Sequence, residues 1–228
     1  MLQTVLVPVA PEGRPFIAIA VVIALVLLYL GPVPGAAGIA LAGWVAYFFR
    51  DPPRVVPARE GLVVSPADGI VVSVTEAVPP ADLGLGAEPL TRISVFLNVF
   101  DVHVNRTPVA GTVERVAYYT GLFVNASLDK ASTGNERNGV TLLLDDGRRV
   151  GVVQIAGLIA RRIVCHLREG DRVATGERFG LIRFGSRTDL YLPKGVAPLV
   201  ALGQRMIGGE TVMADLRSGE GPRGGIQR

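Results

Sequence analysis

The feature that most constrains this chain is a long stretch near its N-terminus that carries no charged side chain. No Asp, Glu, Lys or Arg occurs between Phe16 and Phe49. A membrane-spanning helix needs about 20 apolar residues, so this stretch is too long for one span and short for two. The sequence GPVPG at 31–35 interrupts it, and both proline and glycine disfavour a continuous helix. We therefore predict two short apolar helices, 16–30 and 36–49, that form a membrane hairpin.

Basic residues flank this stretch on both sides, and they predict its orientation. Arg14 precedes it, and three arginines follow it at positions 50, 54 and 59. Because basic residues favour the cytoplasmic side, both ends of the hairpin are expected on the cytoplasmic face of the cell (inner) membrane, whether the hairpin spans the bilayer or only enters it. A cleaved signal peptide is the alternative, but the apolar run is too long for one and Glu12 accompanies Arg14 in the N-terminal region.

The rest of the chain is predicted to be mainly β. Short runs rich in β-branched residues alternate with glycine and proline. The predicted strands are 69–74, 93–99, 140–144, 150–155, 173–182 and 188–192. Asp145-Asp146-Gly147 predicts a tight hairpin turn between two of them. Segment 122–133 is predicted to be a short helix or a loop, and the polar, glycine-rich tail after Arg217 is predicted to be disordered.

Two stretches of the β region repeat one pattern, which suggests the type of β fold. PADGIVVSV at 66–74 and PVAGTVERV at 108–116 share a P-x-x-G-x-V start. This pattern resembles the half-motifs of biotinyl and lipoyl carrier domains, which are flattened β-sandwich barrels. We therefore expect residues 1–55 to be a membrane anchor and residues 56–228 to be an antiparallel β-sandwich or barrel with short helices.

The composition excludes several classes of function. The formal net charge is only +3 and no basic run is interleaved with aromatic residues, so a nucleic-acid partner is not expected. One cysteine and two histidines argue against a disulfide framework and against a structural metal site. Cys165 is expected to be a buried and inert thiol.

Four residues stand out as candidates for chemistry, although each also has an ordinary structural explanation. His103 ends an apolar run, and His166 follows another. A single histidine is more often structural than catalytic, and Asp68 before Gly69 is typical of a simple turn. Ser186 follows Gly185 between two strand-like runs, which is also compatible with a turn.

Taken in order, these motifs resemble the phosphatidylserine decarboxylase family, in its short bacterial and archaeal form. The resemblance covers Phe48 to about Asp215. It rests on FFRDPPR at 48–54, ADG at 67–69, FLNVFDVHVNRTP at 96–108, DKAS at 129–132, NERN at 135–138 and GS at 185–186. Gly-Ser alone carries no weight, whereas the ordered set is specific.

The resemblance implies that the chain is a proenzyme that cleaves itself between Gly185 and Ser186. The Ser186 hydroxyl attacks the Gly185 carbonyl in an N-to-O acyl shift, and elimination and hydrolysis then leave a pyruvoyl group. The products are a β chain, 1–185, and an α chain, 186–228. Glycine suits the first residue because it leaves the carbonyl accessible and tolerates strained backbone conformations.

A serine hydroxyl is a weak nucleophile without a base. The resemblance suggests that His103 takes the hydroxyl proton and that Asp68 orients the imidazole, as in a catalytic triad. Longer bacterial members of the family carry two histidines three residues apart in this segment, and Arg106 occupies the second position here. His103 then serves both steps, or His166 shares the work.

The resemblance also implies the reaction and the partners. The covalent pyruvoyl group forms a Schiff base with the amine of phosphatidylserine and accepts the electrons released with carbon dioxide, which gives phosphatidylethanolamine. Phosphate recognition favours arginine. The candidates for substrate binding are Arg106, Arg137, Arg161, Arg162 and His166. The expected partners are the phospholipid, the membrane and the two chains of one precursor, and a homodimer is expected from the family alone.

Three alternatives remain open at this point. Asp129-Lys130-Ala131 is similar to the modified-lysine tripeptide of lipoyl domains, which would make the chain a membrane-anchored lipoyl- or biotinyl-like carrier. Ser186 could be the nucleophile of a membrane-anchored serine peptidase. The chain could also be a non-catalytic β domain in which Gly185-Ser186 is an ordinary turn. The carrier would show an adduct in its intact mass, and the other two would remain single unprocessed chains.

Overall fold

The chain is described here by a computed structural model, which covers residues 7–121, 134–157, 162–183 and 185–226. It falls into two compact units. The first comprises the residues up to Pro53 together with Phe100–Val102, and the second comprises Arg54–Val99 and His103–Arg228. The predicted helix or loop at 122–133, which contains the Asp-Lys-Ala-Ser motif, lies outside the described residues.

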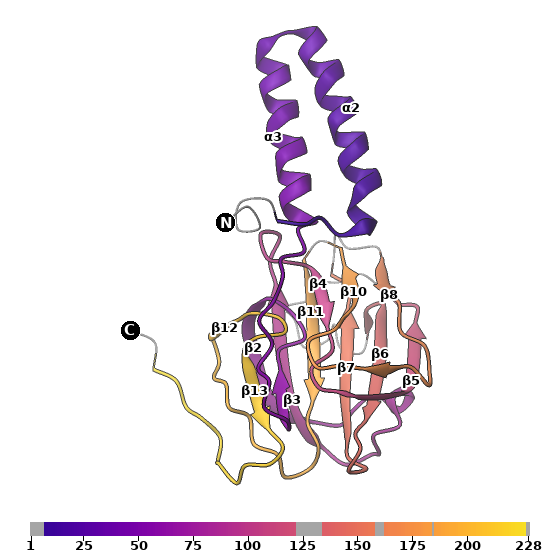
Figure 1. Ribbon diagram of the computed structural model, residues 1–228, viewed down its shortest axis with the longest axis vertical. Coiled ribbons are helices and arrows are strands. Elements are labelled where there is room, and N and C mark those ends of the chain that lie inside the picture. The colour runs from indigo at the N-terminus through magenta and orange to yellow at the C-terminus, as the bar shows by residue number, and fades with distance from the viewer. Residues whose placement is uncertain (1–6, 122–133, 158–161, 184, 227–228) are drawn as a thin grey trace. The chain divides into compact units, whose positions relative to one another are not determined.

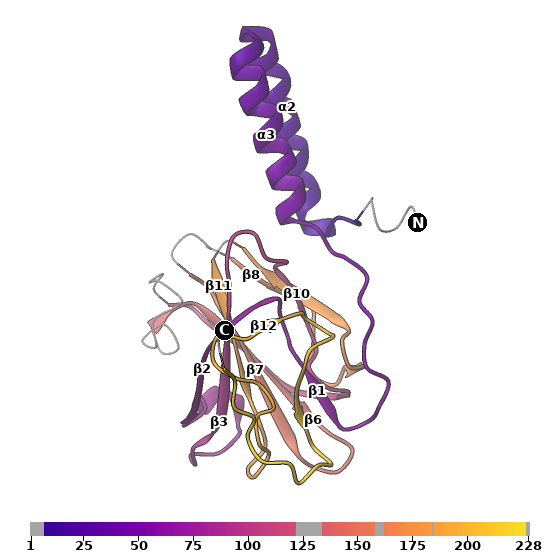
Figure 2. The ribbon, with the colours of Figure 1, turned by 90° about the vertical axis from the view of Figure 1, so that its left-hand side faces the viewer.

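The first unit is built from two apolar helices that pack against each other along their length (Figure 2). A 3-10 turn, η1 (Pro11–Gly13), leads into α2 (Arg14–Leu30), and α3 (Pro32–Phe48) follows after Gly31. The small residues Gly35 and Gly38 let the helices approach, since a side chain at Gly38 would lie 2.8 Å from the Ala24 Cα. This is the type of packing that apolar helices use where small residues line the contact.

The second apolar helix begins earlier than the predicted start at residue 36. Gly31 is the one residue between the two helices, with φ of 143°, and Pro32 and Pro34 lie in the first turn of α3. Proline is compatible with the first turn of a helix because the amide it lacks has no partner there. The prediction was therefore wrong in treating the whole segment 31–35 as the break.

The outward surfaces of these helices are apolar. Leu25, Tyr29 and Val33 are exposed to 62%, 92% and 80% of their side-chain surface. The segment Pro11–Leu30 is long and apolar enough to cross a membrane, whereas Pro32–Phe48, with 17 residues, is shorter. The helices end close together, because Phe16 stacks on Phe49 at 5.4 Å between ring centroids and the Ala10 amide donates to the Phe49 carbonyl at 2.8 Å.

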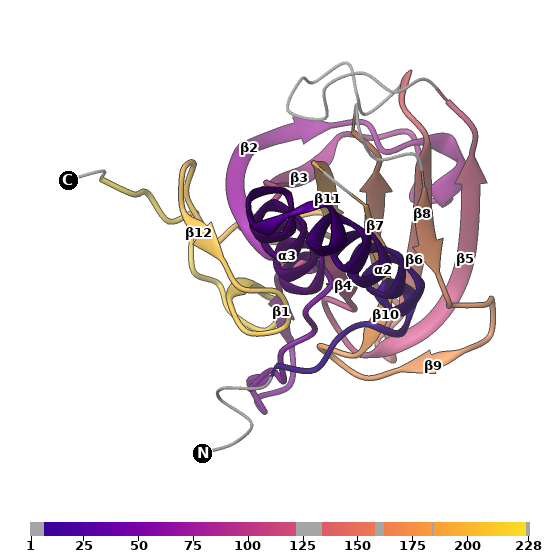
Figure 3. The ribbon, with the colours of Figure 1, turned by 90° about the horizontal axis from the view of Figure 1, so that it is seen from above.

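The second unit is mainly β, as predicted, and its main sheet is antiparallel and curled (Figures 1 and 3). Within the described residues, eight strands form this sheet in the order β12-β2-β3-β11-β7-β6-β5-β9. The strands are β2 (Gly69–Ala77), β3 (Leu90–Leu97), β5 (Gly111–Tyr119), β6 (Arg137–Leu143), β7 (Arg149–Ile155), β9 (Arg172–Val173), β11 (Ser186–Tyr191) and β12 (Arg205–Met206).

Two smaller sheets accompany the curled one. A three-stranded sheet has the order β4-β10-β8, and a two-stranded sheet pairs β1 with β13. Their strands are β1 (Leu62–Val64), β4 (Val104–Arg106), β8 (Ile163–Cys165), β10 (Arg178–Ile182) and β13 (Val212–Asp215). A short 3-10 turn, η2 (Ala81–Leu83), lies between β2 and β3.

The repeated P-x-x-G-x-V pattern corresponds to an internal two-fold repetition of the curled sheet. The two stretches lead into β2 and β5, which have nine residues each and occupy equivalent places near opposite edges of the sheet. The residues just before each stretch bond to the first residue of the other, since the Arg106 amide donates to the Pro66 carbonyl and the Val64 amide to the Pro108 carbonyl. The likeness to biotinyl and lipoyl half-motifs remains a prediction.

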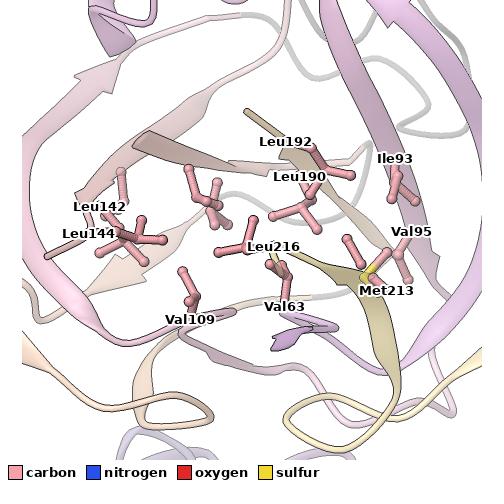
Figure 4. Packing of buried hydrophobic residues seen from close by; sticks show 14 of the residues in the cluster. Val63, Ile93, Val95, Val109, Leu142, Leu144, Leu190, Leu192, Met213 and Leu216 are labelled. Carbon is pink, nitrogen blue, oxygen red and sulfur yellow. The ribbon is translucent and has the colours of Figure 1, made fainter. Parts of the chain in front are cut away.

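A single apolar cluster fills the interior of the curled sheet (Figure 4). The inward residues of neighbouring strands supply it, with Val95, Leu142, Val152 and Leu190 among its members, all at most 2% exposed. Met213 and Leu216 from the C-terminal part of the chain close it. Burial of each such side chain contributes roughly 1.5–3 kcal/mol, so this cluster is the main source of stability.

Most of the predicted strands are present, with shifted limits. The hairpin at Asp145-Asp146-Gly147 is confirmed, because the Gly147 amide donates to the Leu144 carbonyl at 3.0 Å between β6 and β7. The predicted strand 173–182 is instead two strands, β9 and β10, separated by a turn at Gly176. Residues 218–226 form neither helix nor strand and are exposed.

Replacement of Gly111 by alanine tests the close approach at the start of β5. The added methyl would lie 2.7 Å from the Leu143 carbonyl oxygen, so the strands must separate or shift. We expect Gly111→Ala to lower the free energy of unfolding by about 1–3 kcal/mol. Thermal unfolding of the detergent-solubilised protein measures this, with Gly219→Ala in the open tail as control. Equal melting temperatures for the two variants would contradict the expectation.

Candidate active site

Ser186 is the first residue of β11 and lies in the interior of the β unit. Its side chain is fully buried, and its hydroxyl oxygen has no hydrogen-bond partner within the described residues. Gly185 precedes it with φ of 62°, a left-handed conformation that costs an L-residue roughly 1–2 kcal/mol. Apart from its chain neighbours, no atom of the described residues lies within 4 Å of the position a Gly185 side chain would take. The peptide bond at this point therefore joins a glycine with open space at its side-chain position to a serine with a buried hydroxyl.

Strand β11 is held on both sides along its length. Ser186 pairs with Leu97 of β3, and Arg187 pairs with both Phe96 of β3 and Ile155 of β7. Because side chains alternate along a strand, Ser186, Thr188 and Leu190 face the interior, and Arg187 and Asp189 face the outer side. The outer pair forms a buried ion pair, with the Arg187 Nε 2.8 Å from the Asp189 Oδ1.

His103 lies between β3 and β4, next to the segment that leads to Ser186. It is 2% exposed, and its carbonyl accepts a hydrogen bond from the Ile182 amide at 3.3 Å. Ile182 ends β10 and stands four residues before Ser186. His103 therefore contacts the end of β10, and the chain continues from there to the Gly185–Ser186 bond.

Asp68 lies at the same end of the sheet, just before β2. Gly69 is in such close contact with β3 that a side chain there would lie 2.2 Å from the Phe96 carbonyl oxygen. Since Phe96 pairs with Arg187, Asp68 and Ser186 lie at the same end of the curled sheet. His103 is linked to this region through its bond with Ile182, four residues before Ser186.

The Asp68 carboxylate is held by two groups that the sequence had not indicated as its partners. The Arg54 Nη2 donates to both Asp68 oxygens at 2.9 and 2.8 Å, and the Gly208 amide donates to Oδ1 at 2.8 Å. The Arg54 and Asp68 side chains are 9% and 12% exposed. Sequence reasoning treated Arg54 only as a flanking charge, although it ends the FFRDPPR motif.

A layer of polar side chains separates Ser186 from the apolar core. The Asn138 Nδ2 donates to the Gln154 Oε1 at 3.0 Å, and the Gln154 Nε2 donates to the Asn105 Oδ1 at 2.8 Å. Thr188, one inward position below Ser186, pairs with Gln154. All four residues are at most 2% exposed, so the interior changes from apolar to polar toward Ser186.

Cys165 borders this layer and has a raised pKa. Burial raises the pKa of its thiol above the usual value, and hydrogen bonds with the Leu167 backbone and the Asn138 side chain offset part of the shift. The thiol therefore stays protonated at neutral pH. Cys165 is half-buried, so the prediction of a buried thiol was wrong, and its inert role stays a prediction.

The candidate substrate-binding residues have different surroundings. Arg106 is half-buried in β4 and donates to the Gly176 carbonyl at 3.2 Å. Arg137 faces the outer side of the sheet, where its guanidinium lies 4.1 Å from the centre of the Tyr119 ring, and not the side that Ser186 faces. His166 and Arg162 are exposed, and Arg161 lies outside the described residues.

Sequence comparisons show the family of this chain. The sequence model of the family described as phosphatidylserine decarboxylase matches residues 41–214. A protein named phosphatidylserine decarboxylase proenzyme from Cereibacter sphaeroides is 58% identical over 228 residues, which is 100% of this chain and 98% of the relative. Proteins of the same name from Ruegeria pomeroyi and Xanthobacter autotrophicus are 59% and 61% identical, over 95% and 96% of this chain and 99% and 93% of the relatives. The chain therefore belongs to the phosphatidylserine decarboxylase family.

Proposed function

We propose that this protein is a self-processing, membrane-anchored decarboxylase that converts phosphatidylserine to phosphatidylethanolamine. The observation that carries the proposal is the environment of Ser186. Its buried hydroxyl follows a glycine in a left-handed conformation, at the end of the sheet where Asp68 also lies, and His103 bonds to the segment that leads to it. The family membership supports the same reaction.

The residues around Ser186 fit a pyruvoyl group made from this serine. The buried Ser186 hydroxyl has no hydrogen-bond partner among the described residues. A smaller or apolar residue would fill the same place at lower cost, so stability alone does not explain the serine. The pyruvoyl group supplies the electron-accepting carbonyl that decarboxylation of an amino acid headgroup requires. The protein supplies a closed site, in which the polar layer below Ser186 offers hydrogen-bonding groups and the core beneath it excludes water.

In the cleavage step, His103 removes the proton of the Ser186 hydroxyl as the oxygen attacks the Gly185 carbonyl carbon. His103 then gives this proton to the Ser186 nitrogen, the bond between this nitrogen and the Gly185 carbonyl carbon breaks, and an ester with a free amine remains. Asp68 supports the charge that develops on His103, and Arg54 and the Gly208 amide fix the Asp68 carboxylate in place. Because the Asp68 carboxylate and the Arg54 guanidinium are already held in place, they need not move when charge develops on His103.

The strand pairing supports a mature protein in which both chains remain together. The α chain, 186–228, contributes β11, β12 and β13, and each of these pairs with strands of the β chain, 1–185. Cleavage would therefore remove one covalent bond and leave the sheet intact.

The apolar helices α2 and α3 support an anchoring role at the membrane that holds the substrate. We propose that they form a hairpin in the cytoplasmic face of the cell membrane, and that one of the candidate arginines, such as Arg106, contacts the lipid phosphate. A homodimer remains a family-level expectation.

Intact mass spectrometry of the purified protein is the direct test of this function. We expect two chains that break between Gly185 and Ser186, with the downstream chain starting in a pyruvoyl group. Ser186→Ala should give a single chain and no decarboxylation of phosphatidylserine vesicles, because the nucleophile is absent. A wild-type protein that stays a single chain after prolonged incubation would contradict the proposal.

Replacement of Gly185 by alanine tests the left-handed conformation at the cleaved bond. Because the space around Gly185 is open, alanine brings a backbone penalty of about 1–2 kcal/mol without a clash. We expect cleavage to slow by roughly 5- to 30-fold if the reactive conformation bears this penalty. Gly195→Ala is a matched control, since Gly195 has φ of 82° and equally open surroundings. Equal cleavage rates for both variants, measured by gel densitometry, would remove Gly185 from the mechanism.

The two histidines provide a matched pair for the role of the base. His103→Gln should slow cleavage by about 100-fold or more, the usual contribution of a general base. His166→Gln should cleave at the normal rate, because His166 is exposed at the end of β8. The time course of chain splitting measures both. Normal cleavage of His103→Gln would reassign the base.

A further inference from the structure

A second carboxylate, Glu136, lies in the interior. It belongs to the same row of laterally paired residues across the sheet as Ser186, and such a row is called a level below. Arg187 pairs with Ile155, and Ile155 pairs with Arg137, so the next level holds Ser186, Ala156 and Glu136. The Ala156 amide donates to the Glu136 carbonyl at 2.9 Å, which continues the pairing beyond the end of β6. Neighbouring strands are about 4.8 Å apart, so the backbones of Ser186 and Glu136 are about 10 Å apart.

The side chain of Glu136 faces the same interior as Ser186. Asn138, two residues along the chain, faces inward, because it bonds Gln154, which in turn bonds Asn105 on the three-stranded sheet. The alternation of side chains places Glu136 on this inner face, and Arg137 on the outer one. Only the small side chain of Ala156 stands between Glu136 and Ser186 along the sheet. The sheet is curled (Figure 3). Side chains on the inner face of a curled sheet converge, so those of neighbouring strands approach one another.

The Glu136 carboxylate has a hydrogen-bond partner for only one of its two oxygens within the described residues. It is 7% exposed, and its Oε1 has no hydrogen-bond partner within the described residues. The carboxylate also bonds the Tyr118 side chain; burial and this bond raise the pKa of Tyr118 to about 12, so its hydroxyl stays protonated and donates. A buried carboxylate with one unused oxygen is costly, which is most readily explained if a cationic ligand occupies that oxygen.

The substrate of the proposed function carries such a cation. Its amine is protonated in water, and an ammonium ion has no lone pair with which to attack a carbonyl. A carboxylate near residue 186 can bind the ammonium group and accept one proton, which leaves a neutral amine and a carboxylic acid. Atoms and charge balance without any other reactant.

We propose that Glu136 is the residue that binds the amine of phosphatidylserine and takes its proton before the amine reacts at position 186. This inference rests on the proposed function, because it needs the carbonyl made from Ser186. It assigns Glu136 to the substrate, and it leaves His103 and Asp68 to chain cleavage. Tyr118 holds the other carboxylate oxygen and orients the group.

A purely structural role for Glu136, as the hydrogen-bond acceptor of Tyr118, makes a different prediction. Glutamine could replace the carboxylate in shape and could still accept a hydrogen bond from Tyr118. A structural role therefore predicts that Glu136→Gln is harmless, whereas a proton acceptor is lost entirely in this variant.

Reductive capture of amines on the mature protein tests the inference by mass and not by turnover. The wild type, Glu136→Gln and Tyr118→Phe are incubated with cyanoborohydride and either phosphatidylserine in detergent or hydroxylamine. Hydroxylamine is neutral at pH 7 and needs no proton acceptor before it attacks. The mass gained by the 186–228 chain is followed over time. We expect Glu136→Gln to capture phosphatidylserine about 100-fold more slowly and hydroxylamine at the wild-type rate. Tyr118→Phe should slow the capture of phosphatidylserine, but by less than Glu136→Gln, because the carboxylate remains and loses only one orienting hydrogen bond; capture of hydroxylamine should be unchanged.

Several results would overturn the inference without affecting the proposed function. Equal capture of phosphatidylserine by Glu136→Gln and the wild type would show that the carboxylate does not handle the amine. An equal loss with both reagents would indicate a damaged site. Failure of Glu136→Gln to cleave would assign Glu136 to processing. By contrast, a wild-type protein that neither cleaves nor captures any amine would overturn the proposed function itself.

Discussion

The hydrogen bonds on both sides of β11 fix the position of Ser186, and the rest of the site depends on them. Ser186 pairs with Leu97, and Arg187 pairs with Phe96 and Ile155. A strand in the middle of a sheet cannot shift its register without turning its inward residues outward. The first residue of β11 is therefore held at a defined depth in the interior. Gly185 immediately precedes it in a left-handed conformation.

The interior of the curled sheet combines two requirements that usually conflict. Stability needs a closed apolar core, and chemistry needs polar groups that are not fully neutralised. The structure separates them along the strands, with Leu190 and Val152 in the core, then Thr188 and Gln154, and then Ser186 and Glu136. The amide side chains of the middle layer bond one another, so they add polarity without unpaired charge. The buried polar atoms without described partners, on Ser186 and Glu136, thus lie at one end of the sheet.

Much of the β unit could be predicted from local signals, and most of the site geometry could not. The Asp-Gly turn before β7 and the repeated P-x-x-G-x-V pattern are short-range features, and both correspond to real elements. The break in the apolar stretch was predicted too broadly, because the positions of Pro32 and Pro34 within the first turn of α3 depend on where Gly31 ends the preceding helix.

The partners of the candidate site residues depend on contacts between distant parts of the chain. Arg54 and Gly208 meet at Asp68 across 14 and 140 residues of sequence, and no local pattern indicates that meeting. The same holds for the chain of amides at residues 105, 138 and 154. In the sequence Glu136 is only part of the NERN motif, and its place across from Ser186, with Ala156 between them, follows from strand register. Register is set by the whole sheet, so a reader of the sequence has no means to derive it.

The outer face of β11 explains how a new chain end could stay in place after cleavage. Chain ends usually fray, because their first residues have few contacts. Here the residue after Ser186 is Arg187, and its ion pair with Asp189 is almost completely buried, at 2% and 1% exposure. A buried ion pair adds little net stability, but its geometry is specific, because breaking it in a medium of low polarity is costly. Displacement of the first residues of β11 would break this pair. The inner face of the strand thus carries the reacting residue, and the outer face keeps that residue from moving.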